Sequence, residues 1–107
     1  MKNIFLDTNI ILDYLALRQP FYIDADKIFS MAENDVINLF CSSLSFSTIF
    51  YVLRKLQQPK QLFQTLADLT QTMSITSVGE KTILDALNSK FKDLEDAIQY
   101  FSAFRFG

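Results

Sequence analysis

The pattern of hydrophobic and polar positions predicts strands separated by pairs of helices. Short apolar or alternating runs are typical of strands in a largely buried parallel sheet. Such runs span residues 2–7, 36–41 and 73–78. Stretches in which apolar residues recur every three or four positions predict helices. These span residues 8–17, 21–34, 43–56, 59–73, 79–89 and 94–104. The resulting order, β-αα-β-αα-β-αα, implies a single α/β domain over residues 1–107 with a short parallel sheet and right-handed crossovers.

The end of the sequence departs from this alternation. A βα series normally closes with a strand, whereas this sequence ends at Arg105-Phe106-Gly107, directly after a predicted helix. Two interpretations stay open at this point: a natural helical ending, or a domain that lacks its C-terminal part.

Composition places the chain among small globular domains and excludes several kinds of chemistry. Eleven Phe in 107 residues can build a real core, and 2 Gly and 2 Pro are too few for a disordered chain. The net charge of −2 lacks the basic footprint of a general nucleic-acid binder, with Arg54, Lys55 and Lys60 as the nearest approach to a basic patch. Without His, triads that use His and zinc sites with His ligands are excluded.

The remaining absences point to a cytoplasmic protein whose metal, if any, has oxygen ligands. The single Cys41 lies in an apolar run, which favours a core position over a nucleophile. The first apolar run is too short for a signal peptide or a membrane-spanning helix, so no membrane association is expected. Carboxylate ligands alone favour Mg²⁺ or Mn²⁺.

Asp7 is the first candidate site residue, because it follows the apolar run Ile4-Phe5-Leu6 and precedes a helix. Ligands of open α/β sheets bind just beyond the carboxyl ends of the strands. A carboxylate at that position faces the crevice. The alternative is a helix N-cap, a position that Asp favours as well.

A second acidic cluster, Asp93-Leu94-Glu95-Asp96, opens the last predicted helix. Asp93 suits the N-cap, and acids in the first turn suit the helix dipole. Helical geometry places Asp96 beside the apolar face and Glu95 on the other flank, so Asp96 is the acid expected to border a crevice. The face expected to be buried comprises Leu94, Ala97, Ile98, Phe101 and Phe104, and the flank of Glu95 also holds Gln99 and Ser102.

The helix after Ser42-Ser43 is amphipathic in the ordinary way. The expected core face comprises Phe46, Ile49, Phe50, Leu53 and Leu56, and the expected polar side comprises Ser45, Thr48, Tyr51 and Lys55.

Three segments together resemble the successive motifs of PIN domains, the metal-dependent nucleases that include the VapC-type toxins of toxin–antitoxin pairs. They are Leu6–Asp13, Ser42–Ser45 leading to Tyr51–Leu53, and Asp93–Ala97, and the resemblance runs from residue 2 to about residue 104. It implies a three-layer α/β/α fold. It further implies an RNA-cleaving enzyme that uses Mg²⁺ or Mn²⁺, with an antitoxin protein as a partner.

The resemblance assigns roles to individual residues. Asp7 and Asp96 become the catalytic, metal-binding carboxylates, and Asp93 becomes either a third oxygen ligand or the cap. Contacts to a metal-bound water or to the RNA fall to Thr8, Asn9 and Thr48. Thr48 stands where the family usually carries a glutamate, and the family's fourth acid lies on a strand beyond residue 107.

These departures predict weak metal binding, because about two carboxylates remain of the usual four. A catalytically weak or inactive module that binds RNA or a protein is therefore the alternative function, and a truncated fragment is a third interpretation. Without the later strand, the strand at 2–7 is expected to form a sheet edge, which favours a homo-oligomer or dependence on a partner. The alternative is that the last helix covers this edge.

Overall fold

A computed structural model describes residues 2–106, and the order of their elements is the predicted one. The strands are β1 (Lys2–Phe5), β2 (Ile37–Ser42) and β3 (Met73–Thr76). The helices are α1 (Thr8–Leu15), α2 (Tyr22–Glu33), α3 (Ser43–Leu53), α4 (Pro59–Leu69), α5 (Glu80–Leu87) and α6 (Leu94–Phe106). None of the described helices is long and apolar enough to cross a membrane.

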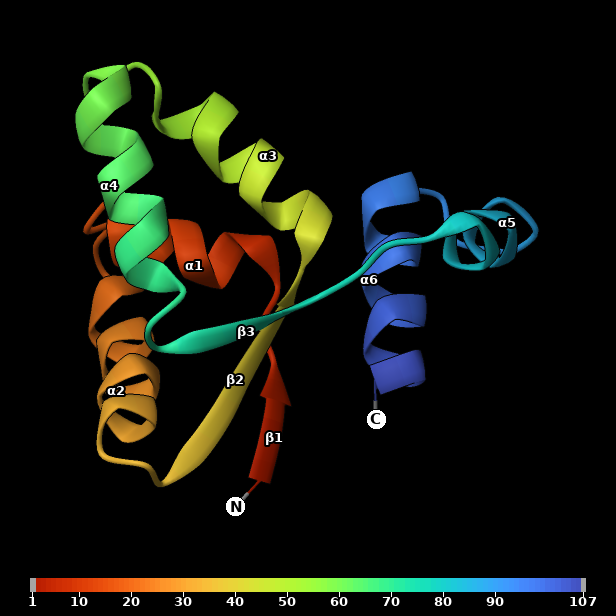
Figure 1. Cartoon of the computed structure of the whole chain (residues 1–107), viewed down its shortest axis with the longest axis horizontal. Helices are drawn as coiled ribbons and strands as arrows, with labels where there is room; N and C mark the ends of the chain where they lie inside the picture. Colours follow the sequence, from red (N-terminus) through yellow and green to blue (C-terminus); the bar gives the residue numbers. More distant parts are fainter. Residues whose placement is uncertain (1, 107) are drawn as a thin grey trace.

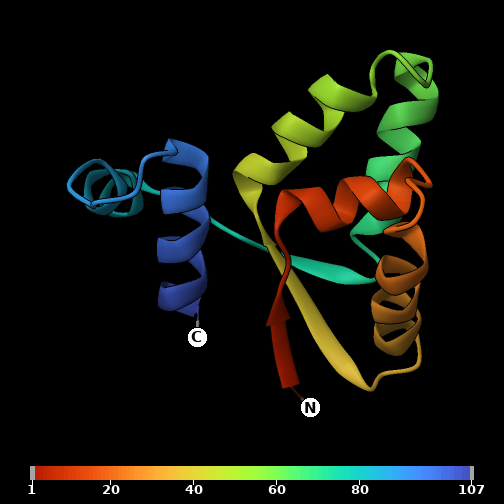
Figure 2. The same ribbon diagram turned by 180° about the vertical axis from the view of Figure 1, so that it is seen from behind.

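The sheet is parallel, with strand order β1-β2-β3, so β2 is central and β1 forms one edge of the described sheet. Lys2 pairs with Ile37, and Leu39 pairs with Met73. Figures 1 and 2 show α1, α2 and α4 on one side of the strands and α5 and α6 on the other. The predicted α/β class and the layered α/β/α arrangement are confirmed.

The hydrophobic core is divided unequally between these two sides. The main cluster joins the sheet to α1–α4 and includes Leu6, Ile11, Phe29, Leu39 and Ile49. A second, much smaller cluster of buried residues holds α5 and α6 together and comprises Ala86, Ala97 and Ile98. In both views the α5–α6 pair lies to one side of the sheet (Figures 1 and 2), and α6 contacts β2 and β3. The placement of the pair therefore depends on the contacts that α6 makes with the rest of the domain.

Several helix ends differ from the predicted ones because the chain turns through left-handed residues. Leu17 has φ 53° and Asp35 has φ 59°. The N–H of Arg18 donates to the carbonyl of Asp13 across the end of α1, the bond that defines a Schellman motif. Glycine usually occupies this left-handed position, so the sequence carries no signal for it. Leu17, expected in a buried helix, is therefore outside α1 and 63% exposed.

Other boundaries and faces are also corrected. Helix α4 ends at Leu69, and Met73 begins β3 instead of ending the helix. Phe21 and Leu56, both expected on core faces, are exposed because they lie outside α2 and α3 respectively. The strand expected over 73–78 is only four residues long.

Cys41 lies in the fully buried part of β2, as the sequence indicates. Burial raises the pKa of its thiol to about 12, because the thiolate would be desolvated there. We therefore expect no reaction with a disulfide-exchange reagent at pH 8 while the protein is folded, and complete reaction in denaturant. Rapid labelling of the folded protein in a thiol assay would contradict the core assignment.

Candidate active site

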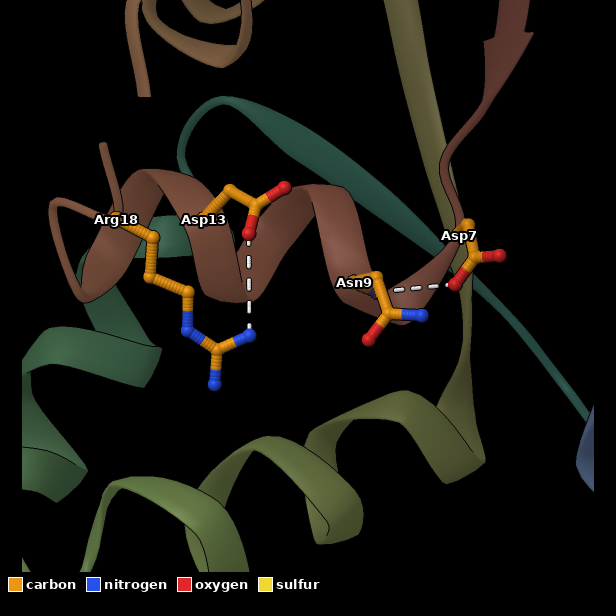
Figure 3. A network of polar contacts seen from close by, with 4 residues as sticks. All are labelled: Asp7, Asn9, Asp13 and Arg18. Atoms are coloured by element: carbon orange, nitrogen blue, oxygen red, sulfur yellow. Dashed lines mark hydrogen bonds and ion pairs between the residues drawn. The ribbon is translucent and has the colours of Figure 1, made fainter. Parts of the chain in front are cut away.

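Asp7 occupies both of the positions that the sequence allows for it. It follows the end of β1 in an extended conformation and is the N-cap of α1. Its Oδ1 accepts a hydrogen bond from the N–H of Asn9 at 2.9 Å (Figure 3). The side chain is exposed, and no described residue donates to its other oxygen. Asp7 therefore caps the helix with one oxygen and keeps the second available for a ligand.

Asp93 and Asp96 divide the roles that their cluster suggests. The N–H of Asp96 donates to Oδ1 of Asp93 at 3.0 Å, and the N–H of Ala97 donates to the Asp93 carbonyl at 3.1 Å. These bonds give Asp93 the capping role, the alternative to a metal ligand. Asp96 is exposed and lies in the first turn of α6.

Asp7 and Asp96 line the same cavity, of about 500 Å³, although they are 89 positions apart in the sequence. The cavity lies between the carboxyl end of β1 and α6. Its other lining residues are Phe5, Phe91, Gln99, Tyr100 and Ala103. The strand-end position of Asp7 and the helical position of Asp96 thus converge. That the two carboxylates share a cation remains a prediction.

A row of polar contacts holds α6 against the N-terminal ends of α1 and α3. The backbone N–H of Thr8 donates to Oε1 of Gln99 at 3.1 Å, and the hydroxyls of Thr8 and Ser45 are 2.8 Å apart. Oγ1 of Thr48 donates to Oε2 of Glu95 at 2.7 Å. These bonds join α6, which carries Asp96, to α3 and to α1, the helix that Asp7 caps.

The predicted interior face of α6 is confirmed at its centre, where Ala97 and Ile98 are buried and Phe101 packs against them, but not at its ends. Leu94 and Phe104 are exposed, whereas Gln99 and Ser102 are buried. The helix turns the flank of Glu95 toward α1 and α3, where it meets polar partners. The hydroxyl of Ser102 has no hydrogen-bond partner among the described residues. The burial of Gln99 and Ser102 was not predicted because amphipathic analysis assumes that a buried helix face is apolar.

The predicted exposure of polar residues on α1 and α3 also differs from the structure. Ser45, expected on the solvent side of α3, is buried against Thr8. Thr8 is 2% exposed and its hydroxyl contacts that of Ser45, while its contact with RNA stays a prediction. Asn9 is exposed beside Asp7, and Thr48 is half-buried and faces Glu95.

The donor set fits a hard cation held by few protein ligands. Mg²⁺ and Mn²⁺ accept carboxylate oxygens and retain several waters, so Asp7 and Asp96 suffice for a weak site. Within residues 2–106, no three acidic, Cys or His side chains are grouped closely enough to hold a metal. Asp93 therefore does not complete a three-carboxylate cluster in this arrangement.

Comparison with known proteins identifies the family. Residues 3–106 match the family described as PIN domain. The chain belongs to the PIN domain family. This PIN domain is 26% identical over 107 residues to a protein named Ribonuclease VapC1 from Aquifex aeolicus (strain VF5). The alignment covers 95% of this chain and 74% of that protein. No solved structure matches the chain.

Thr48→Glu tests whether α3 of this PIN domain can contribute to the metal site. The new carboxylate would stand beside Glu95, to which Thr48 now donates, and added negative charge favours a divalent cation. We expect Mn²⁺ affinity to rise by about tenfold, since ligand charge count tunes such affinities. Calorimetry with Mn²⁺ measures it, and Thr48→Gln is the uncharged control of the same size. Equal affinity in the two variants would show that position 48 does not face the site.

Proposed function

We propose that this PIN domain is a divalent-metal-dependent endoribonuclease, the toxin of a toxin–antitoxin pair. The observation that carries the proposal is the placement of Asp7 and Asp96 on one cavity at the carboxyl end of β1. The name of the similar protein, Ribonuclease VapC1, supports RNA as the substrate class. The motifs shared with VapC-type toxins support a protein antitoxin as the partner.

Asp7 and Asp96 would hold Mg²⁺ or Mn²⁺ through one or more oxygens each, with water completing the shell. When bound, the cation polarises the phosphate and lowers the pKa of a coordinated water toward neutrality. The protein fixes the positions of the two carboxylates. Asp7 is fixed by its bond to the N–H of Asn9, and the Asp96 helix is fixed by Gln99 and Glu95. The exposed Asn9 amide, at the positive end of α1, is suited to contact the RNA backbone.

Metal dependence of RNA cleavage tests the proposal directly. The purified chain is incubated with single-stranded RNA of mixed sequence in Mn²⁺, in Mg²⁺ and in EDTA. We expect cleavage with either metal, none with EDTA, and recovery when excess Mn²⁺ is restored. Cleavage that persists in EDTA would indicate a contaminating nuclease, and the absence of cleavage over the full range of metal concentrations would contradict the proposed activity.

A module that binds RNA without cleaving it is the second candidate. It is favoured by Thr48 at the usual glutamate position and by the presence of only two carboxylates on the cavity. Fluorescence anisotropy with labelled RNA distinguishes the two functions. Saturable RNA binding together with no metal-dependent cleavage would identify the binding module.

A further inference from the structure

Gln99 is a buried polar residue with an orientation that its contacts determine. It is 8% exposed, lies on α6 and lines the cavity that holds Asp7 and Asp96. The N–H of Thr8, which can only donate, lies 3.1 Å from the amide oxygen of Gln99. This bond requires the amide oxygen to face α1, so it determines which of the two terminal atoms is Oε1 and which is Nε2. The NH₂ group must point elsewhere.

The Nε2 atom of Gln99 has two N–H donors that no described residue accepts. The bond to Thr8 is the one hydrogen bond that the Gln99 side chain makes with residues whose side chains are described, 2–104. Nε2 is also not among the fully enclosed atoms without a partner, a condition met in the described chain by Oγ of Ser102. Nε2 therefore remains accessible from solvent. The described cavity that Gln99 lines is the one that also holds Asp7 and Asp96. A nearly buried amide donor of this kind favours a ligand with an acceptor oxygen.

We propose that Gln99 is a substrate-positioning residue that donates an N–H from Nε2 to a phosphate oxygen of the RNA. This inference rests on the proposed ribonuclease function and adds a residue to the site. The two carboxylates favour a cation but repel a phosphate at close range. A Lys or Arg in the same place would pair with Asp7 or Asp96 and compete with the metal. A neutral amide gives the phosphate a donor without that competition.

The bond to Thr8 explains how a flexible side chain can act as a fixed donor. Thr8 begins α1 directly after Asp7, and Gln99 follows Asp96 by three positions on α6. The same bond therefore orients the amide and sets the spacing of the two acids. Positioned donors of this type are effective because their orientation is established before the substrate arrives.

Gln99→Glu separates the donor from the anchor. A carboxylate oxygen still accepts from the Thr8 N–H, while the NH₂ group is replaced by a second oxygen that faces the cavity. At saturating Mn²⁺, we expect the KM for a single-stranded RNA oligonucleotide to rise by about tenfold, since a hydrogen bond to a charged group is lost. Calorimetry should show Mn²⁺ affinity rising by about tenfold, because a third carboxylate joins Asp7 and Asp96. A purely structural role would not weaken the binding of RNA, seen as a higher KM, while strengthening the binding of Mn²⁺.

Gln61→Glu is the matched control, since Gln61 is exposed on α4, away from α6 (Figure 1). It should change neither quantity. Gln99→Met, which removes both donor and acceptor at similar size, covers the case in which Gln99→Glu does not fold, as judged by circular dichroism. We expect it to raise KM without raising Mn²⁺ affinity.

An unchanged KM in a folded Gln99 variant would overturn the donor role, whatever the Mn²⁺ affinity shows. An unchanged Mn²⁺ affinity in folded Gln99→Glu would overturn the orientation toward the cavity. Calorimetry requires no cleavage, so it tests Gln99 independently. Failure of the wild-type chain to cleave RNA would count against the proposed function and not against the orientation of Gln99.

Discussion

Asp7→Asn is expected to reduce metal-dependent RNA cleavage by at least about a hundredfold, since even residues that only support metal ligands cost up to this much. The substitution removes one of the two carboxylates on the cavity and halves the negative charge that they offer a cation. An amide oxygen is a weaker ligand for Mg²⁺ or Mn²⁺ than a carboxylate. Cleavage of labelled single-stranded RNA over a Mn²⁺ series measures the loss.

The fold should survive this substitution. The Asp7 side chain caps α1 by accepting from the N–H of Asn9, and an Asn oxygen can accept the same bond. Because Asn and Asp are nearly equivalent N-caps, the free energy of unfolding should change by no more than about 0.5 kcal/mol. Denaturant unfolding followed by circular dichroism verifies that the lost activity is not lost structure.

Asp13→Asn is the matched control on the same helix. Asp13 forms an ion pair with Arg18 at 3.8 Å and lies nearer the other end of α1, away from Asp7 (Figure 3). Its replacement changes the net charge by the same amount but leaves the cavity intact. Cleavage by Asp13→Asn should match the wild type. Comparable activity in the Asp7 and Asp13 variants would remove Asp7 from the catalytic site.

The sequence predicts the architecture well because strands and helices have different hydrophobic patterns. Short apolar runs followed by helical repeats identify all three strands and six helices of the described chain. The strand-end rule and the helical position of Asp96 also point correctly to a shared cavity. Both inferences depend on local geometry, namely where β1 ends and how side chains are arranged around α6.

The polar contacts between α1, α3 and α6 could not be predicted in the same way. Gln99 and Ser45 lie on flanks that amphipathic analysis assigns to solvent, yet both are buried. Each contacts Thr8, Gln99 through the backbone N–H and Ser45 through the hydroxyl. A single sequence shows which residues are polar but not which polar faces meet. The sequence allows Asp93 to be either a cap or a metal ligand, and the hydrogen bond from the N–H of Asp96 in the structure assigns it the capping role.

We predict that the 107-residue chain self-associates, because one edge of β1 is open in the described sheet. Within the described sheet, β1 pairs with β2 alone. The N–H of Leu6 donates to the carbonyl of Phe40, so alternation along the strand places the N–H groups of Asn3 and Phe5 on the open side. The cavity between Phe5 and α6 leaves space beside that edge, and Phe104 on α6 is 74% exposed. An edge of this kind favours pairing with another strand.

We expect light scattering to show a molecular mass that rises above the monomer value with concentration. Pairing satisfies backbone groups whose burial without partners costs about 1–3 kcal/mol each, and it covers the apolar surface of α6. Asn3→Pro removes one outward N–H, a change that an edge strand tolerates, and should weaken association through β1. Phe104→Glu should weaken association through α6 instead. The variant that restores the monomer therefore identifies the contact, and a well-folded wild-type monomer at high concentration would contradict both routes.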